Sequence, residues 1–244
     1  MFSRWLFGTW DSQFTLTAYL DQIDGLTTEA RLETGVEYMN NSPFEEVNIP
    51  LKWYSTLPDT IMNKVRVSAG LLPHDTIIQD RSFNVFEIMK LLNFGRVQKV
   101  LYNTRVNPDK ASVVMNNDLP IKTWELQLLD IHVGNVASVE DFSTSEIVKA
   151  VPITSFRHSV TPQGMELEVL SKYQLVSEGV ISAKLRIMAR TPQGITAFFP
   201  YNSSRLLFAM DYDVTMMRRE APSEAPPMGA SACVETPKGL TQCI

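Results

Sequence analysis

The chain is poor in the residues that most often carry catalysis, metal binding or cross-links, with two cysteines and three histidines among 244 residues. Cys233 and Cys243 both lie in a C-terminal stretch rich in proline and small residues, so we expect no disulfide framework and assign neither thiol a role. His74, His132 and His158 each stand alone, away from cysteine and from metal-ligand spacing. No metal site and no cofactor are therefore predicted.

Long apolar runs and clustered glycines are also missing. No run of about eighteen apolar residues occurs, and the N-terminus MFSRWLFGTW lacks the aliphatic stretch and cleavage site of a secretory signal, so synthesis in the cytosol is expected. The glycines are scattered, and the GxGxxG, GxxxxGK[ST] and GxSxG motifs are absent. This argues against nucleotide binding and acyl transfer, and we expect a protein that is not an enzyme.

Charge is sorted into blocks along the chain, although the net charge is only -5. Residues 1–60 carry three basic against nine acidic side chains, and residues 123–150 carry one against five. Residues 61–122 carry nine basic against five acidic side chains, and residues 151–219 carry eight against five. Such blocks let copies of one chain, or a charged partner, dock by complementarity, although solvated faces also produce them by chance.

Both ends of the chain are expected to be flexible. Residues 1–28 form an aromatic-rich segment that needs a surface to bury against: its own core, another copy or the interfacial zone of a bilayer. Protein is favoured over lipid because basic residues are scarce there. Residues 220–244 are rich in proline, alanine, serine and glycine, which is typical of a disordered tail. The residues predicted to mediate membrane binding or self-association are Phe2, Trp5, Leu6, Phe7 and Trp10.

Residues 29–219 are expected to form a single β-rich globular domain with one strong helix signal. The helix is predicted to begin near Ser82, with Asn84 and Glu87 spaced as in a capping box and Gly95 as the stop. Apolar residues recur there at helical spacing and would share one face. They are Val85, Ile88, Met89 and Leu92.

Alternation of apolar and polar residues predicts strands at residues 65–67, 97–106 and 121–133. The clearest pattern lies at residues 151–201, where the turn-forming tetrapeptide Thr-Pro-Gln-Gly occurs twice. We expect a four-stranded antiparallel meander there, with its dry face covered by the helix near Ser82. The predicted fold is thus α+β, an antiparallel sheet meander packed against one or two helices, with disordered terminal segments.

The outer face of this meander is expected to be basic. Overall acidity argues against binding of bare RNA, so a protein-coated nucleic acid or an acidic protein surface is the expected partner, with ordinary solubilising charge as the alternative. Glu166 and Glu168 alternate with apolar residues, which indicates a solvated face and not a glycosidase pair. The basic face comprises Lys184, Arg186, Arg190, Arg205, Arg218 and Arg219.

Several features of the stretch from Met165 to Asp211 point to one family. They are the run Glu178-Gly179-Val180-Ile181, the alternating strand through Ile187, the Gln193-Gly194 turn and the Asn202-Ser203-Ser204 stretch. In these features the stretch resembles the C-terminal part of rhabdovirus matrix proteins. The helix in RSFNVFEIMKLLNF occupies the place of a family helix.

This resemblance implies a virion structural protein that self-associates into homo-oligomers and drives assembly and budding. It would condense the viral nucleocapsid and link it to the inner face of the membrane and to the envelope glycoprotein. The implied locations are the virion, the host cytoplasm, its membranes and the nucleus. The N-terminal lysine cluster and Pro-Pro-x-Tyr motif of many animal-virus members are absent, which fits a plant- or insect-virus member better.

Two other functions compete with this one. A plant-virus cell-to-cell movement protein would also be β-rich with disordered ends, and would bind single-stranded RNA tightly with a steep salt dependence. A hydrolase or transferase would need a site assembled in space, for example a deep pocket that holds a histidine beside a carboxylate.

Overall fold

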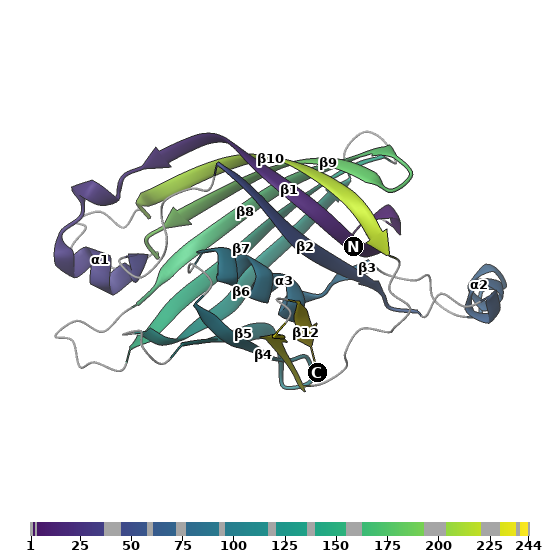
Figure 1. Cartoon of the computed structure of the whole chain (residues 1–244), viewed down its shortest axis with the longest axis horizontal. Coiled ribbons are helices and arrows are strands. Elements are labelled where there is room, and N and C mark those ends of the chain that lie inside the picture. The colour runs from purple at the N-terminus through teal and green to yellow at the C-terminus, as the bar shows by residue number, and fades with distance from the viewer. Residues whose placement is uncertain are drawn as a thin grey trace.

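The computed structural model folds the chain around one continuous antiparallel sheet (Figure 1). It describes residues 2, 4–36, 45–57, 61–71, 77–92, 96–116, 121–135, 140–154, 163–192, 204–220, 230–237 and 240–243. The helices are η1 (Arg4–Leu6), η2 (Ile23–Gly25), α1 (Thr28–Thr34), α2 (Ile61–Ser68) and α3 (Arg81–Leu92), of which η1 and η2 are short 3₁₀ turns. The strands are β1 (Gly8–Asp21), β2 (Glu46–Ser55), β3 (Ile77–Gln79), β4 (Val97–Asn103), β5 (Asn107–Met115), β6 (Ile121–Asn135), β7 (Asp141–Thr154), β8 (Met165–Ser177), β9 (Val180–Arg190), β10 (Leu206–Glu220), β11 (Ala230–Glu235) and β12 (Thr241–Cys243).

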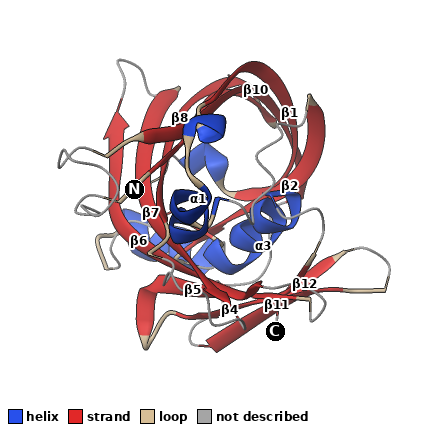
Figure 2. Ribbon diagram, turned by 90° about the vertical axis from the view of Figure 1, so that its left-hand side faces the viewer, coloured by secondary structure: helices blue, strands red, loops and turns tan. Residues whose placement is uncertain are grey.

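The sheet has the strand order β12-β11-β4-β5-β6-β7-β8-β9-β10-β1-β2-β3. Long antiparallel strands twist, and the accumulated twist rolls this sheet around an interior that contains α3 (Figure 2). From β4 to β10 each strand pairs with the next one in sequence, so the predicted meander is present and extends further than expected. Of the four strands expected within residues 151–201, the middle two correspond to β8 and β9, whereas residues 155–160 and 195–201, expected to form most of the first strand and the fourth, lie outside the described residues.

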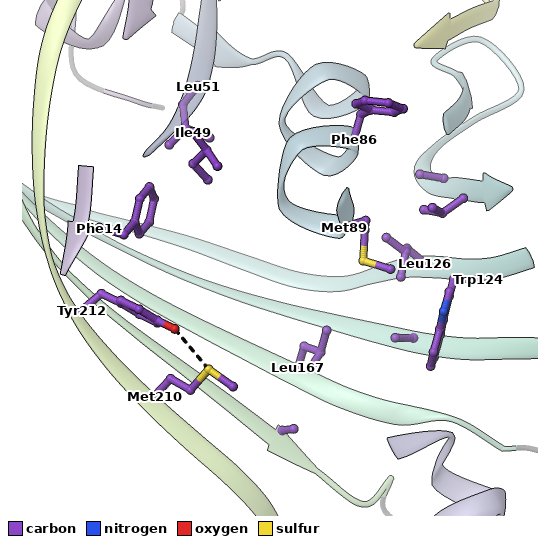
Figure 3. Packing of buried hydrophobic residues seen from close by; sticks show 14 of the residues in the cluster. Phe14, Ile49, Leu51, Phe86, Met89, Trp124, Leu126, Leu167, Met210 and Tyr212 are labelled. Atoms are coloured by element: carbon purple, nitrogen blue, oxygen red, sulfur yellow. Dashed lines mark hydrogen bonds between the residues drawn. The ribbon is translucent and has the colours of Figure 1, made fainter. Parts of the chain in front are cut away.

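Strict alternation of side chains separates the inside of the roll from the outside. Along β9, Ile181, Ala183 and Ala189 are buried while Lys184 and Arg186 face solvent, as the sequence pattern predicts. β8 and β9 are joined at Glu178-Gly179, where Gly179 has a φ of 79°, a conformation that glycine adopts at low cost. Buried side chains from several strands and from α3 meet in the interior (Figure 3).

The expected flexibility of the N-terminal segment is wrong for residues 8–21, which form β1 between β10 and β2. Trp10 and Phe14 alternate with polar residues and point inward, so the segment has the period of a half-buried strand. Pairing on both edges satisfies its backbone groups. The aromatic content had suggested a docking segment, whereas the spacing of the aromatics is that of a central strand.

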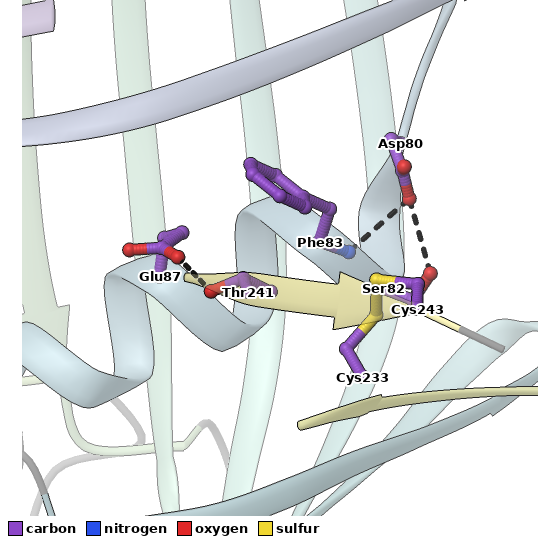
Figure 4. The surroundings of a disulfide bond; sticks show 7 residues. All are labelled: Asp80, Ser82, Phe83, Glu87, Cys233, Thr241 and Cys243. Carbon is purple, nitrogen blue, oxygen red and sulfur yellow. Dashed lines mark hydrogen bonds between the residues drawn. A yellow bond between two sulfur atoms is a disulfide. The ribbon is translucent and has the colours of Figure 1, made fainter. Parts of the chain in front are cut away.

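The expected disorder of the tail is also wrong for residues 230–235 and 241–243, which form β11 and β12. β11 pairs with β4, and Cys233 lies directly opposite Cys243 in the β11–β12 ribbon. The two cysteines, to which no role was assigned from the sequence, form a disulfide (Figure 4). A cross-link restricts the unfolded chain, so it supports a short ribbon that has little apolar surface of its own.

The short strand expected at residues 65–67 is also wrong, because these residues belong to α2. Val-Arg-Val alternates over only three residues, too few to distinguish a strand from a helix. Ile61 and Val65 stand four apart and share one side of the helix, yet both are exposed.

Helix α3 confirms the strongest helix signal but is capped differently from the prediction. The Asp80 carboxylate accepts hydrogen bonds from the Phe83 amide at 3.1 Å and from the Ser82 hydroxyl at 3.0 Å, so Asp80 satisfies the first turn. Asn84, expected to be the cap, lies inside the helix. The expected stop at Gly95 lies outside the described residues.

Asn84 instead ties α3 to the sheet. Its side-chain oxygen accepts a hydrogen bond from the Lys52 amide at 2.8 Å, and its side-chain nitrogen donates to the Lys52 carbonyl at 3.1 Å. The side chain thus occupies both backbone groups of a β2 residue, as a neighbouring strand would. Asn84 is buried, so water does not compete for these bonds.

The opposite side of α3 is held by the C-terminal ribbon. The Thr241 hydroxyl donates to the Glu87 carboxylate (Figure 4). Lys90 pairs with Glu235. α3 therefore packs against β2 on one side and against β4, β11 and β12 on the other. The helix was expected to cover the meander of residues 151–201 directly, but it closes the seam of the roll and faces β8 and β9 across a cavity.

We predict that Asn84→Ala destabilises the fold. The change removes both hydrogen bonds and leaves the Lys52 backbone without these partners, so the free energy of unfolding in urea should fall by about 1–3 kcal/mol. Asn116→Ala, an exposed asparagine after β5, is the matched control and should cost less than about 0.5 kcal/mol. Equal effects of the two substitutions would contradict the role of Asn84.

Candidate binding cavity

The interior of the roll contains a cavity of about 220 Å³. Most of its lining is aliphatic or aromatic and comes from α3 and from the inward positions of the strands (Figure 3). Val85 and Ile88 reach it from α3, while Val169 and Leu185 reach it from β8 and β9. Interiors pack at nearly crystalline density, so an apolar space of this size is unusual and is the leading candidate for a binding site.

One end of the roll is closed by the aromatic N-terminus. Phe2 and Trp5 each contact the Phe142 ring edge-on, with centroids 6.1 and 5.3 Å apart. Phe142 in turn stacks on Tyr173 at 4.8 Å. Together these rings form an aromatic cluster in which the N-terminal segment packs on the protein itself.

The other residues predicted for membrane binding or self-association also contact this chain's own core. Leu6 and Trp10 are fully buried, and the Trp10 indole donates to the Leu6 carbonyl at 2.7 Å. Phe7 is half-buried against the same core. Of the three targets expected for the N-terminal aromatics, the structure provides the protein's own core, and contact with lipid or another copy stays a prediction.

Helix α1 lies at the opposite end of the roll, inside the ring of strands seen in Figure 2. Thr27 caps the helix by accepting a hydrogen bond from the Ala30 amide at 3.2 Å. Ala30, together with Leu26 and Val36 on either side, is buried in the core. The chain thus supplies its own cover at both ends of the roll.

A small set of polar side chains interrupts the apolar lining. On β7, Thr144 and Glu146 occupy inward positions, and Thr144 lies opposite Ser171 of β8 in the strand register. Arg81, the first residue of α3, reaches the same lining. Its guanidinium donates to the Pro108 carbonyl at 3.5 Å, a long contact, and the Tyr102 hydroxyl donates to that carbonyl at 2.7 Å.

The electrostatics of these groups follow from their burial. Loss of water raises the pKa of the Glu146 carboxyl, and the positive charge of Arg81 partly offsets this. Burial also raises the pKa of Tyr173, to about 12; its hydrogen bond with Ser171 lowers the pKa and the charge of Glu146 raises it further. Within the described residues, Glu146 forms neither a hydrogen bond nor an ion pair, so its carboxyl is free to meet a ligand.

Of the residues predicted to form a basic face, Lys184, Arg186, Arg190 and Arg219 lie on the outside of β9 and β10, whereas Arg218 is paired with the inward-facing Trp10; their charges are largely compensated. Arg186 makes two hydrogen bonds of 2.6 Å to Asp211, which lower the pKa of that carboxyl. The face therefore offers less free positive charge than the sequence suggests, and its binding of a nucleocapsid stays a prediction. The remaining contacts of its side chains are Lys184–Asp213 at 3.9 Å, Arg190–Glu168 at 3.5 Å, Arg219–Asp11 at 2.7 Å, Arg218 to the Trp5 carbonyl at 2.8 Å, and Arg218 over the Trp10 ring at 4.9 Å. Arg205 lies half-buried just before β10.

Other kinds of site find little support in the described part of the chain. His132 is exposed beside Asp130, at 2.9 Å, while His74 and His158 lie outside the described residues. No group of three or more metal-ligating side chains occurs among the residues that the structure describes. Within the same residues, none of the helices combines the length and the apolar character needed to cross a bilayer.

Comparison with known proteins provides no relative for this chain. No protein-family model matches it, and neither a curated protein nor a solved structure is similar to it. The resemblance to rhabdovirus matrix proteins accordingly stays a prediction drawn from the residues quoted above. Function has to be argued from the geometry of the chain itself.

The polar residues of the cavity were not predicted from the sequence. The sequence feature that could have revealed them is on β7, where Thr144 and Glu146 occupy the inward positions between Phe142 and Val148. A carboxylate in an inward position departs from the alternation of a half-buried strand. The inward phase of β7 is visible only once its register with β6 and β8 is known.

We predict that Glu146→Gln changes how stability depends on pH. The folded-state pKa of Glu146 lies above its ordinary 4.5, so its contribution is present below that value and is lost as the pH rises through the folded-state pKa. The variant should therefore gain free energy of unfolding relative to the parent as the pH rises above about 4.5. Glu178→Gln, in the exposed β8–β9 turn, is the control. Parallel pH profiles for Glu146→Gln and the parent would disprove the prediction.

Proposed function

We propose that the protein is a non-enzymatic binding protein that holds an apolar small molecule inside its rolled sheet. The observation that carries the proposal is the cavity of about 220 Å³ with its nearly continuous apolar lining. A ligand of the same apolar character is favoured there, because burial of apolar surface is worth about 25 cal/mol per Å².

The size of the cavity supports a small ligand. An apolar protein cavity of about 150 Å³ binds benzene, whereas drug-sized ligands occupy pockets of about 300–1,000 Å³. The space here lies between these limits. It suits a compact ring or a short alkyl chain, which would lie between α3 on one side and β8 and β9 on the other.

A homologous series of straight-chain alcohols tests this proposal. Each methylene that enters the cavity should lower the dissociation constant about fourfold, which corresponds to about 0.8 kcal/mol, until the space is full and the affinity levels off. Isothermal titration calorimetry measures the series. Absence of binding, or an affinity that does not depend on chain length, would refute the proposal.

Substitution of two valines on β8, one in the cavity lining and one exposed, tests where the ligand binds. Val169→Phe places a large ring in the cavity and should weaken binding of 1-octanol at least about tenfold, since roughly 1.4 kcal/mol or more of contact is lost. Val176→Phe introduces the same ring at an exposed position, where the parent valine is 62% exposed, and should leave binding unchanged. Equal effects would place the ligand elsewhere.

A second candidate function, the matrix-type assembly protein implied by the resemblance, is favoured by helix α2. The helix stands away from the body of the molecule in Figure 1, and Ile61 and Val65 are 83% and 56% exposed. Leu71, just beyond the helix, is 74% exposed. Residues 61–71 contain no acidic side chain, so this surface complements the acidic block of residues 1–60 on another copy.

We predict that the double substitution Ile61→Ser and Val65→Ser lowers concentration-dependent self-association. Two exposed apolar side chains are lost from α2, so sedimentation velocity should show a larger share of monomer at a given concentration. Val106→Ser changes an apolar residue that is 81% exposed on the β4–β5 turn and serves as control. Identical sedimentation of the parent and the α2 variant would count against assembly through this helix.

A further inference from the structure

Several polar residues of the cavity lining come from β7, β8 and the start of α3. Thr144 and Ser171 are directly paired across β7 and β8, and Glu146 is the next inward residue on β7. Arg81 reaches the lining from the first turn of α3. The lining beyond this group is dominated by apolar side chains, among them Val148, Leu167 and Ile187.

Arg81 occupies a position that helix formation does not favour. Positive side chains are disfavoured near a helix N-terminus because the backbone dipole is positive there. Arg81 is half-buried, and its guanidinium, which has five N–H donors, contacts the Pro108 carbonyl at a long 3.5 Å and the Tyr102 side chain. Helix stability therefore does not account for an arginine at this place.

We infer that the ligand of the cavity is a neutral amphiphile whose hydroxyl head lies between Arg81 and Glu146, with its apolar body among the aliphatic side chains. This inference rests on the proposed function, since it names the head group of the same ligand. It assigns the orientation of the ligand and the two side chains that select it.

Hydrogen-bonding chemistry favours a hydroxyl over a charged head. A hydroxyl donates to one group and accepts from another at once, which matches an acceptor carboxylate at Glu146 and donor N–H groups at Arg81. A carboxylate head only accepts hydrogen bonds, so it would pair with Arg81 and be repelled by the charge of Glu146. An ammonium head only donates, so it would pair with Glu146 and be repelled by the charge of Arg81. Burial strengthens this opposition because water screens little inside the roll.

The net charge facing the ligand points to the same head group. Arg81 and Glu146 carry opposite charges, so they sum to zero around the head. The other charged residues of the lining are exposed, Asp109 and Lys110 on β5 and Lys184 on the outer face of β9, so solvent screens them. Lys110 and Lys184 also pair with Glu125 and Asp213 at 2.6 and 3.9 Å.

Three probes of equal chain length test the head group: 1-octanol, octanoate and octylamine, titrated at neutral pH into the full-length protein. We expect 1-octanol to bind at least about tenfold more tightly than either ion, because each ion leaves one buried charge opposed and unpaired. Equal affinities, or tighter binding of one of the ions, would overturn the inference.

Two variants reverse the selectivity in opposite directions. Glu146→Gln leaves Arg81 uncompensated, so octanoate should gain affinity about tenfold or more relative to octylamine. Arg81→Gln leaves Glu146 uncompensated, so octylamine should gain by a similar factor. Glu178→Gln, an exposed carboxylate in the β8–β9 turn, is the control and should not change the order of the probes. Near-ultraviolet circular dichroism verifies that each variant is folded.

The outcomes separate this inference from the proposed function. Failure of all three probes to bind the folded parent protein overturns both. All three probes could bind with an order of affinities that neither Glu146→Gln nor Arg81→Gln changes. This result overturns only the inference, because the cavity would then bind apolar chains regardless of their head groups. A reversal in the directions stated supports both.

Discussion

Closure of the roll by α3 is the constraint on which the rest of the structure depends. Asn84 holds the helix to the backbone of Lys52 on β2, and Glu87 holds it to Thr241 on β12. A twisted open sheet would expose its apolar face along the seam, and α3 fills that seam with buried side chains such as Phe86. The β11–β12 ribbon, cross-linked through its disulfide, supplies the second wall. Without this helix there is no enclosed space between β2 and β8.

The roll distributes charge in a way that bears on both candidate functions. On the outer face, Arg186 is matched by Asp211 across β9 and β10, so the predicted basic surface is a set of neighbouring ion pairs of modest strength in water. Inside, Glu146 and Arg81 line the cavity without a close ion pair between them. The charges of the outer face are therefore matched by close partners, whereas Glu146 faces the cavity with only the more distant charge of Arg81 to offset its burial, which favours an internal ligand.

The sequence indicated the middle of the sheet and the position of α3 because these depend on local periodicity. Alternation along β8 and β9 and the spacing around Val85 are short-range signals. β1 was missed because its aromatic content suggested a docking segment, although Trp10 and Phe14 have strand spacing. β11 was missed because its partner β4 lies more than a hundred residues away, and no local pattern reveals such pairing. The polar lining residues of the cavity could not be predicted, because only the strand register places Thr144 opposite Ser171.

Diffraction from crystals held under xenon pressure tests most directly whether an apolar space lies between α3 and β8. Xenon enters dry cavities lined by aliphatic and aromatic side chains and is repelled by hydrated ones. A strong xenon peak between Ile88 and Val169, in contact with the aliphatic lining, is the expected result. Xenon found only on the outer surface, with ordered water or close-packed side chains between α3 and β8, would contradict the account.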